Sequence, residues 1–403
     1  MQLIPAPGPL RLLAFATLVN TVGNGLFYTS AALFYTRSVG LSPTQVGAGL
    51  LISGLLSLLV GIPAGHLGDL RGAREVLVAL LIAEGLAMAA FGLVHSFGGF
   101  VAASVAYSCL DKAANAVRQG LIAGALPPEL RVTGRAYLRS LTNLGIGAGT
   151  VGAGLAIAAG TRTAYLTLIF ADAVTYVLSA AVITRLPATA PADRRTGGGM
   201  LVALRDRPFV VVTLVNAVLA MHYAVLEVGV PLWVDRYTSA PTWTVAVLFL
   251  VNTTCCVLFQ VRASRRAVDV RSSALVMRRG ALLLAASYLV FALSADRSTG
   301  VAVAVLVVAA VVNVVGELQQ AAGSWGLGFG LAPEHAQGQY QGLFSTGFAA
   351  SSMLGPILVT STAITFGAVG WLALALLFAA AGALGVHVVV WAERDRARSL
   401  VRS

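Results

Sequence analysis

The chain has 403 residues, of which 58% are hydrophobic and only 11% are charged, and its mean hydropathy is +0.84. Soluble domains carry about a quarter charged residues, so this composition excludes a water-soluble globule. The net charge of +11 does not indicate nucleic-acid binding, because the arginines lie in short stretches between apolar blocks and form no continuous stripe.

Apolar blocks follow one another along the chain, each of the length, about twenty residues, that a helix needs to cross a hydrocarbon core of about 30 Å. Only helices take so many separate spans through lipid, because each helix satisfies its own backbone hydrogen bonds. We therefore predict an all-α membrane protein with twelve transmembrane helices, over 11–34, 45–65, 76–94, 97–125, 140–160, 163–184, 208–233, 242–260, 275–294, 299–325, 341–361 and 370–391.

The placement of arginine predicts the orientation of these helices. With the N-terminus in the cytoplasm, twenty-one arginines fall on the cytoplasmic side and four fall outside, namely Arg37, Arg162, Arg236 and Arg297. Positively charged residues favour the cytoplasmic side. We therefore predict a multi-pass protein of the plasma (cytoplasmic) membrane with both termini in the cytoplasm.

The longest polar stretch, Arg185–Arg207, is central and rich in Pro and Gly, as is typical of a linker. It predicts an N-terminal six-helix bundle at 1–187, a cytoplasmic linker at 188–207 and a C-terminal six-helix bundle at 208–403. The halves also resemble each other: Leu126-Pro127-Pro128-Glu129 returns 205 residues later as Leu331-Ala332-Pro333-Glu334. Duplicated halves produce such a pattern.

A short motif between the second and third blocks reads Gly65-His66-Leu67-Gly68-Asp69-Leu70-Arg71-Gly72-Ala73-Arg74. It resembles the loop signature of the major facilitator superfamily, commonly written G-x-L-x-D-R-x-G-R-R, and lacks the basic residues expected at Leu70 and Ala73. The resemblance implies the twelve-helix fold of that family (the MFS fold). It also implies a conformational-switch loop formed by Gly65, Asp69, Gly72 and Arg74.

In that loop the resemblance implies that Asp69 contacts a helix N-terminus of the other half in one state only, where the helix dipole favours an anion. Arg74 would then pair with acidic groups nearby. The plainer alternative is a tight cytoplasmic turn with ordinary positive-inside arginines.

The fifth helix carries a run of glycines, Gly145, Gly147, Gly149, Gly152 and Gly154. The run is similar to the antiporter motif G-x-x-x-G-P-x-x-G-G of drug/proton exporters, with Gly145, Gly149 and Gly152 as the antiporter-like positions. Thr150 replaces the proline and the pattern is shifted. A glycine face also lets two helices approach closely without any antiporter meaning, so both interpretations stay open.

Polar side chains at membrane depth normally face a partner or a wet cavity. In the family, helices 1, 4, 7 and 10 line a central cavity, so the resemblance implies that polar stripes on these helices form the substrate and proton site. The predicted site comprises Asn20, Asn24, Asp111, Lys112, Asn115, Arg118, His222, Tyr223, Glu227, Asn313, Glu317 and Gln320.

Within this set, Lys112 (the only lysine) or Arg118 is expected to pair with an acid across the cavity. The candidate acids are Asp111, Glu227 and Glu317; the alternative is a buried ion pair that only locks helices together. Glu84 and Asp172 fall on helices 3 and 6, which are more peripheral in this fold, so a structural role is favoured for them. An aromatic and aliphatic cavity surface would suit amphipathic substrates, and the alternative is that its residues only pack between helices. These residues are Phe27, Tyr28, Trp325 and Phe329.

We predict a secondary active transporter that exports a small organic compound, drug-like or metabolite-like, by proton antiport with alternating access. A proton-coupled uptake permease for a small nutrient and a non-transporting membrane sensor are the alternatives. No metal-spaced His cluster, phosphate loop or nucleophile–base pair is present in the sequence, so we expect no enzyme activity, no metal and no cofactor besides the proton gradient. The expected partners are the lipid bilayer, the substrate and protons, with no nucleic acid, and the chain is expected to be a monomer.

Overall fold

The computed structural model describes residues 5–188, 199 and 201–402, with side chains described as far as 396. Ten of the described helices are long and apolar enough to cross a membrane, or eleven when the bent pair Pro43–Ser57 and Gly61–Arg71 counts as one span. The predicted all-α, multi-span class is therefore confirmed. One predicted span, 97–125, forms a 29-residue helix that is not among these candidates, because three charged residues lower its hydropathy. The count of twelve stays a prediction.

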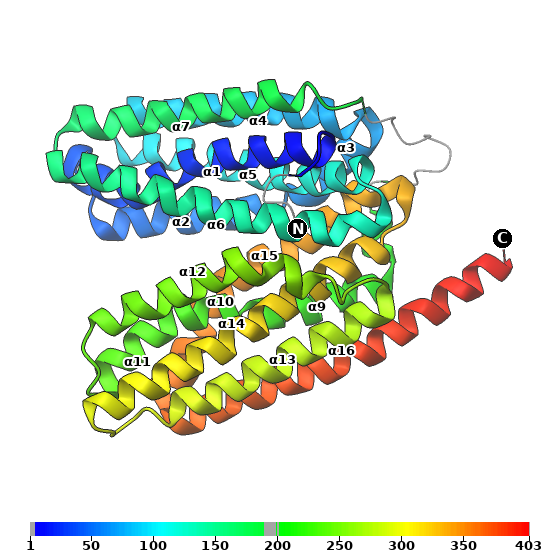
Figure 1. Ribbon diagram of the computed structural model, residues 1–403. Helices are drawn as coiled ribbons and strands as arrows, with labels where there is room; N and C mark the ends of the chain where they lie inside the picture. The colour runs from blue at the N-terminus through cyan, green and yellow to red at the C-terminus, as the bar shows by residue number, and fades with distance from the viewer. Residues whose placement is uncertain (1–4, 189–198, 200, 403) are drawn as a thin grey trace. The chain divides into compact units, whose positions relative to one another are not determined.

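The chain divides into two compact units (Figure 1). Unit 1 holds Met1–Val202 and Ala332–Thr346, and unit 2 holds Ala203–Leu331 and Gly347–Ser403. The sequence places 332–346 in the second half, yet this segment belongs to unit 1, so one helix is divided between the two. Most of the predicted linker, at 189–198 and 200, lies outside the described residues.

Unit 1 packs its helices side by side: α1 lies against α6 and α7, and α4 lies against α5 and α7. A π-helical turn, η1, continues α1, and a 3-10 turn, η2, ends α4. The bounds are α1 Pro9–Leu33, η1 Phe34–Ser38, α2 Pro43–Ser57, α3 Gly61–Arg71, α4 Ala73–Ala90, η2 Phe91–Leu93, α5 Phe97–Ala125, α6 Pro128–Ala159 and α7 Arg162–Ile183.

Unit 2 is organised around α13, which packs against α14 and α16, while α12 packs on α14. The 3-10 turn η4 and the start of α15 belong to unit 1 and the rest of α15 to unit 2. The bounds are α8 Val202–Arg205, α9 Arg207–Ala220, α10 His222–Ala224, η3 Val225–Gly229, α11 Val230–Tyr237, α12 Trp243–Ser264, α13 Val270–Ala292, α14 Thr299–Gly330, η4 Glu334–Ala336, α15 Gln337–Val359, η5 Thr360–Ile364 and α16 Ala368–Arg402.

Local sequence explains where several helices begin. Ser42 and Gln45 form a reciprocal capping box at α2, and Asp269 and Ser272 do the same at α13. The Ser272 backbone N–H and hydroxyl hold the pKa of Asp269 below its ordinary value. Such caps satisfy backbone N–H groups that have no partner inside the helix. The starts of these two helices therefore follow from the residues in the turns that precede them.

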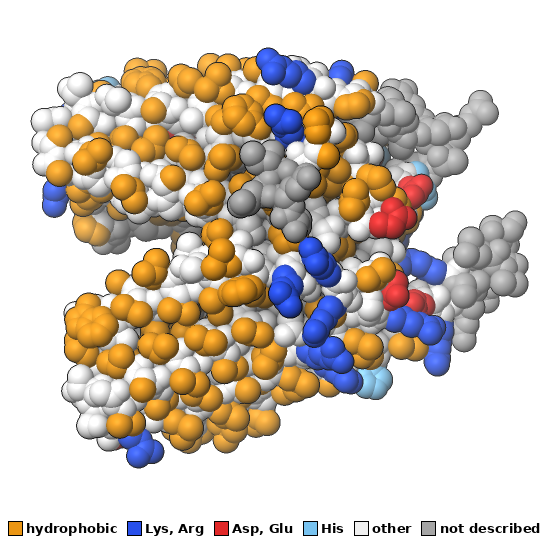
Figure 2. Space-filling model, in the orientation of Figure 1, with side chains coloured by type: hydrophobic (Ala, Val, Ile, Leu, Met, Phe, Trp, Pro, Cys, Tyr) orange, Lys and Arg blue, Asp and Glu red, His pale blue; other side chains and the backbone are white. Residues whose placement is uncertain are grey.

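The outer faces of the helices are apolar. Val151 and Leu155 of α6 are 75% and 78% exposed, and hydrophobic side chains spread over the visible surface (Figure 2). Water would disfavour such a surface, whereas lipid does not distinguish it from a core. Lys and Arg side chains gather towards one end of the helices (Figure 2), where the charged loops meet the polar boundary of a membrane.

Candidate functional site

Unit 1 contains a cavity of about 430 Å³ between α1, α2 and α5. This volume lies in the range of small-molecule sites, roughly 300–1,000 Å³. Its wall is mostly aromatic and aliphatic, with polar groups supplied by serines and by one charged pair. The lining residues that the argument uses are Phe27, Tyr28, Tyr35, Phe91, Tyr107, Asp111 and Lys112.

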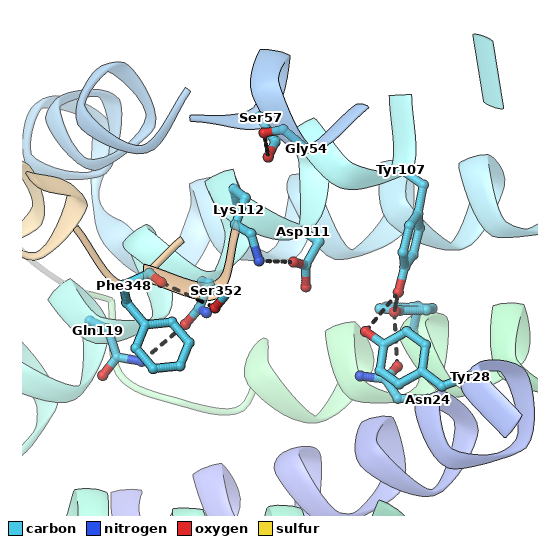
Figure 3. Close-up of polar contacts among 12 residues, drawn as sticks. Asn24, Tyr28, Gly54, Ser57, Tyr107, Asp111, Lys112, Gln119, Phe348 and Ser352 are labelled. Atoms are coloured by element: carbon cyan, nitrogen blue, oxygen red, sulfur yellow. Dashed lines mark hydrogen bonds and ion pairs between the residues drawn. The ribbon is translucent and has the colours of Figure 1, made fainter. Parts of the chain in front are cut away.

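The charged pair is formed by neighbours on α5: Lys112 Nζ lies 3.1 Å from Asp111 Oδ2 (Figure 3). Both side chains are about one-third exposed, at 33% and 29%. Consecutive helix residues point in different directions, so the long lysine stem folds back to reach its neighbour. Of the three acids predicted for Lys112, the structure places Asp111 against it; pairing with an acid of the other half stays a prediction.

The aromatic wall is a single cluster. The centroid of the Phe27 ring lies 5.4 Å from that of Phe91 and 6.1 Å from that of Tyr107, and the Tyr35 ring is tilted against Phe100 at 4.5 Å. Edge-to-face and tilted aromatic contacts of this kind are favourable and rigid. The wall is therefore a preformed apolar surface beside the ion pair.

The other predicted polar residues of unit 1 lie on α1 and α5 and form hydrogen bonds within α5, between α1 and α5, and between α1 and α7. Arg118 Nη2 lies 3.5 Å from Asn20 Oδ1, and Gln119 donates to Asn115 at 3.1 Å. Asn24 accepts a hydrogen bond from the Tyr176 hydroxyl at 2.9 Å. Asn20 is buried and Arg118 half-buried, so the stripe predicted on α5 has a polar partner on α1 within the same unit.

In unit 2 the predicted residues of α14 point at neighbouring helices. Asn252 of α12 donates to Glu317 Oε2 at 2.7 Å, and Cys256 Sγ lies 3.8 Å from Glu317 Oε1. Gln320 donates to Asn216 of α9 at 2.9 Å. Asn313 donates to Ser287 of α13 at 3.1 Å. These contacts link the polar groups to one another inside unit 2.

The seventh predicted helix differs from the sequence expectation. It is interrupted after Ala220, and Val225–Gly229 form a π-helical turn. A π turn adds a residue to the repeat and shifts the register, so the spacing of the predicted stripe changes between Tyr223 and Glu227. Glu227 is exposed, and its place in the predicted site stays a prediction. His222 is buried, and its ring is tilted against that of Tyr223 with the ring centroids 4.0 Å apart.

The predicted switch loop is mostly helical, which corrects the expectation of a loop at this position. α3 continues to Arg71, and Gly72, with φ of +92°, is the single residue that separates it from α4. A positive φ is readily adopted only by glycine. Arg74, in the first turn of α4, pairs with Glu75 at 2.6 Å and donates to the Leu186 carbonyl at 2.6 Å.

Asp69 is a residue of α3, and its carboxylate contacts the start of α15. Its two oxygens accept from the backbone N–H groups of Gly338 and Gln339, at 2.7 and 3.0 Å. Gly65 is the close-approach residue beside it, because a Cβ there would collide with the Gly338 carbonyl. Free N–H groups and the positive end of the dipole favour a carboxylate at a helix N-terminus.

The glycines of α6 divide by face. A Cβ on Gly145 would collide with Thr21, and one on Gly149 would collide with the Val22 carbonyl of α1. A Cβ on Gly152 would lie 3.0 Å from Leu26 Cδ2 of α1. The three antiporter-like positions therefore allow α1 and α6 to approach closely, which is the packing role that small residues have in membranes.

Spacing alone did not single out two tyrosines that the structure brings to the cavity region. Tyr107 of α5 lines the cavity, and Tyr176 of α7 is fully buried and bonded to Asn24. A signal was present in the sequence, since Tyr107 lies four residues before Asp111 and hence on the same helix face. Tyr176 likewise lies four residues after Asp172 on one helix face, but its contact with Asn24 depends on how α7 packs.

These features define a polytopic α-helical membrane protein with an amphipathic internal site. The model of the Major Facilitator Superfamily matches residues 13–356. The chain therefore belongs to the Major Facilitator Superfamily, and it is a secondary transporter and not an enzyme. No curated protein matches it significantly.

Solved structures resemble it over nearly the whole chain at low identity. The human organic anion transporter MFSD10 is 16% identical with a TM-score of 0.69, covering 94% of this chain and 98% of that one. A bacterial homologue of the iron transporter ferroportin in its outward-facing state is 17% identical (TM-score 0.75, 96% and 99%). The fucose:proton symporter FucP of E. coli is 14% identical (TM-score 0.72, 94% and 98%). Likeness at this identity shows the MFS fold.

Proposed function

We propose that this transporter exports a small amphipathic organic compound in exchange for protons, by alternating access of its two halves. The observation that carries the proposal is the cavity of unit 1, whose apolar wall ends at the Asp111–Lys112 pair. Pockets that bind small organic molecules are mostly apolar, with a few polar groups that orient the ligand. Phe27, Tyr35 and Phe91 would hold the apolar body, and the ion pair would receive the polar end.

Exchange with protons is supported by the position of Asp111. A cationic substrate or a proton can compete with Lys112 for the Asp111 carboxylate, because a carboxylate at membrane depth needs a positive partner. Binding of one partner then disfavours the other, which is the condition for coupled exchange. The structurally similar FucP is a fucose:proton symporter, which supports protons as the coupling ion.

Export is supported by two features of the resemblance. Gly145, Gly149 and Gly152 of α6, which resemble the antiporter motif in a shifted pattern, face α1. Asp69 holds the first N–H groups of α15, and we propose that this contact forms in one state of the cycle and opens in the other. Release of such a contact is a switch of the kind that interconverts two packed arrangements.

The experiment uses purified protein in lipid vesicles loaded with a fluorescent amphipathic cation or, in a parallel set, a fluorescent amphipathic anion. We expect an acidic exterior to accelerate efflux of at least one probe and an alkaline exterior to slow it, and a protonophore to abolish the difference. Asp111→Asn should lose the proton-dependent part, while Asp296→Asn, an exposed acid of unit 2, should retain it.

Other outcomes contradict the proposal in distinct ways. Movement of the probe in the same direction as the proton would identify an uptake permease. Saturable binding without any flux would identify a sensor. Flux that ignores the pH gradient in the wild type would exclude proton exchange.

A further inference from the structure

The cavity of unit 1 carries charge at one place. Of the described residues that line it, Asp111 and Lys112 alone are charged, and Lys112 Nζ lies 3.1 Å from Asp111 Oδ2. Two serines of its wall, Ser53 and Ser57 of α2, donate to carbonyls of their own helix, as Figure 3 shows for Ser57. The ion pair is therefore the feature of the cavity that selects the charge of a ligand.

The two charges of the pair neutralise each other, and this restricts the ligands that can separate them. A charge at membrane depth is costly unless it has a partner, and removal of one member of an ion pair leaves the other uncompensated. A cation bound to Asp111 would displace Lys112 from its partner, and an anion bound to Lys112 would do the same to Asp111. A neutral compound would leave the pair intact and gain nothing from it. A ligand that carries both charges satisfies both residues at once.

The layout of the cavity suits a zwitterion whose two charges are close together and adjoin an aromatic ring. The ammonium and carboxylate of an α-amino acid are bonded to one carbon atom, so they can contact two protein charges that lie side by side. The aromatic wall begins about one helical turn from the pair, because Tyr107 lies four residues before Asp111. The Phe27 ring centroid lies 6.1 Å from those of Tyr28 and Tyr107. Rings arranged in this way offer faces and edges to an aromatic ligand.

We propose that the cavity of unit 1 binds an aromatic zwitterion of the α-amino acid type. The ligand's ammonium replaces Lys112 at the Asp111 carboxylate, and its carboxylate binds the released lysine. Its ring packs among Phe27, Tyr28 and Tyr107. Each protein charge exchanges one opposite charge for another, so no charge is left alone. The inference rests on the proposed function and names its substrate class.

The test is equilibrium binding to the purified protein in lipid nanodiscs at pH 7, without any gradient. The radiolabelled probes share a phenyl ring on a short chain and differ in charge: L-phenylalanine is a zwitterion, phenethylamine a cation, 3-phenylpropanoate an anion, and 3-phenyl-1-propanol is neutral. We expect L-phenylalanine to bind about tenfold more tightly than each of the others, the factor that corresponds to one hydrogen bond to a charged group at a partly exposed pair. Glycine, which has both charges and no ring, should not compete.

Two variants should change the preferred charge in opposite directions. In Lys112→Met the Asp111 carboxylate loses its partner, so phenethylamine should bind more tightly than L-phenylalanine. In Asp111→Asn the lysine loses its partner, so 3-phenylpropanoate should bind more tightly than L-phenylalanine. A purely structural role of the pair would weaken all four probes alike. The matched control is Arg271→Met: Arg271 of unit 2 pairs with Glu393 at 2.9 Å, lies outside the cavity, and its loss should keep the wild-type order.

The proposal is overturned if L-phenylalanine shows no saturable binding, if a probe with one charge or none binds as tightly, or if both variants keep the wild-type order. Should the variants not fold, the order of the four probes on the wild type still decides the matter. Binding needs no pH gradient, so failure of the two proposals can be told apart. The expected order without any pH-driven flux would refute antiport alone, while pH-driven flux of a fluorescent probe with no preference for the zwitterion would refute the substrate class alone.

Discussion

Lys112 has an unusual position for a residue type that occurs once in the chain. It lies in a cavity whose wall is mostly aromatic and aliphatic, and its ammonium is bound to the carboxylate of the preceding residue. A lysine at membrane depth is costly unless it has such a partner. With about one-third of the side chain exposed, it is accessible to small reagents from the cavity.

This accessibility predicts a direct assay for ligands. An amine-reactive reagent should label Lys112, and a transported compound at about ten times its Kd should slow that labelling about tenfold, because the occupied fraction excludes the reagent. Labelling is measured by mass spectrometry of the peptide that contains Lys112, with the N-terminal amine as the internal control. Equal labelling with and without a compound that the protein demonstrably transports would place the substrate elsewhere.

Asp69 predicts a second residue-scale effect. In Asp69→Asn, the amides of Gly338 and Gln339 should exchange hydrogen for deuterium about tenfold faster, because a charge-assisted hydrogen bond contributes ~1.5–3 kcal/mol and the neutral amide restores part of it. Hydrogen exchange of the peptide 337–346 measures this. Glu75→Gln is the control, since Glu75 contacts Arg74 and not α15; accelerated exchange in both variants would contradict a specific role for Asp69.

At the scale of elements, α1 and α6 show how glycine permits close packing. Gly25 and Gly149 face each other across the two backbones, whereas a Cβ on Gly147 would meet no described atom within 4 Å. Gly147 and Gly149 are two residues apart on α6 and therefore lie on opposite faces of that helix. The face of α6 that carries Gly149 packs against α1, and the face that carries Gly147 points away from the other helices.

The same substitution at these two positions should therefore have opposite effects. Gly149→Ala places a methyl group against the Val22 carbonyl and should destabilise the protein by ~1–3 kcal/mol, as overpacking does. Gly147→Ala should be neutral or stabilising by up to ~1 kcal/mol, because alanine favours a helix more than glycine does. Thermal unfolding in detergent measures both; an equal loss would show that helix flexibility, and not contact, governs α6.

At the scale of the whole molecule, α15 belongs to both units, with its first residues in unit 1 and the remainder from Gly347 in unit 2. The repeated Leu-x-Pro-Glu segments connect α5 to α6 and α14 to η4 and α15. Repeated halves of this kind are the basis of alternating access in transporters. A helix shared by two units is suited to transmit a change made at Asp69.

The predicted orientation is also a property of the whole chain. In a variant whose three native cysteines are replaced, a single cysteine at Arg297 should react with a membrane-impermeant maleimide added outside intact cells, and one at Arg265 should react only after the membrane is opened. Both positions are exposed, and the arginine asymmetry predicts their sides. Labelling of Arg265→Cys in intact cells would invert the topology.

The sequence by itself determined the membrane class, the helices and the segment around Asp69. These follow from local physics, since lipid requires apolar stretches whose backbones bond internally, and caps and turns are encoded within a few residues. Only the tertiary structure decided that α3 continues through the expected loop and that a π turn interrupts the seventh predicted helix. It also showed that Glu84, for which a structural role was expected, is 1% exposed. The reason is that contacts between helices depend on register, bends and packing, which spacing along one helix does not contain.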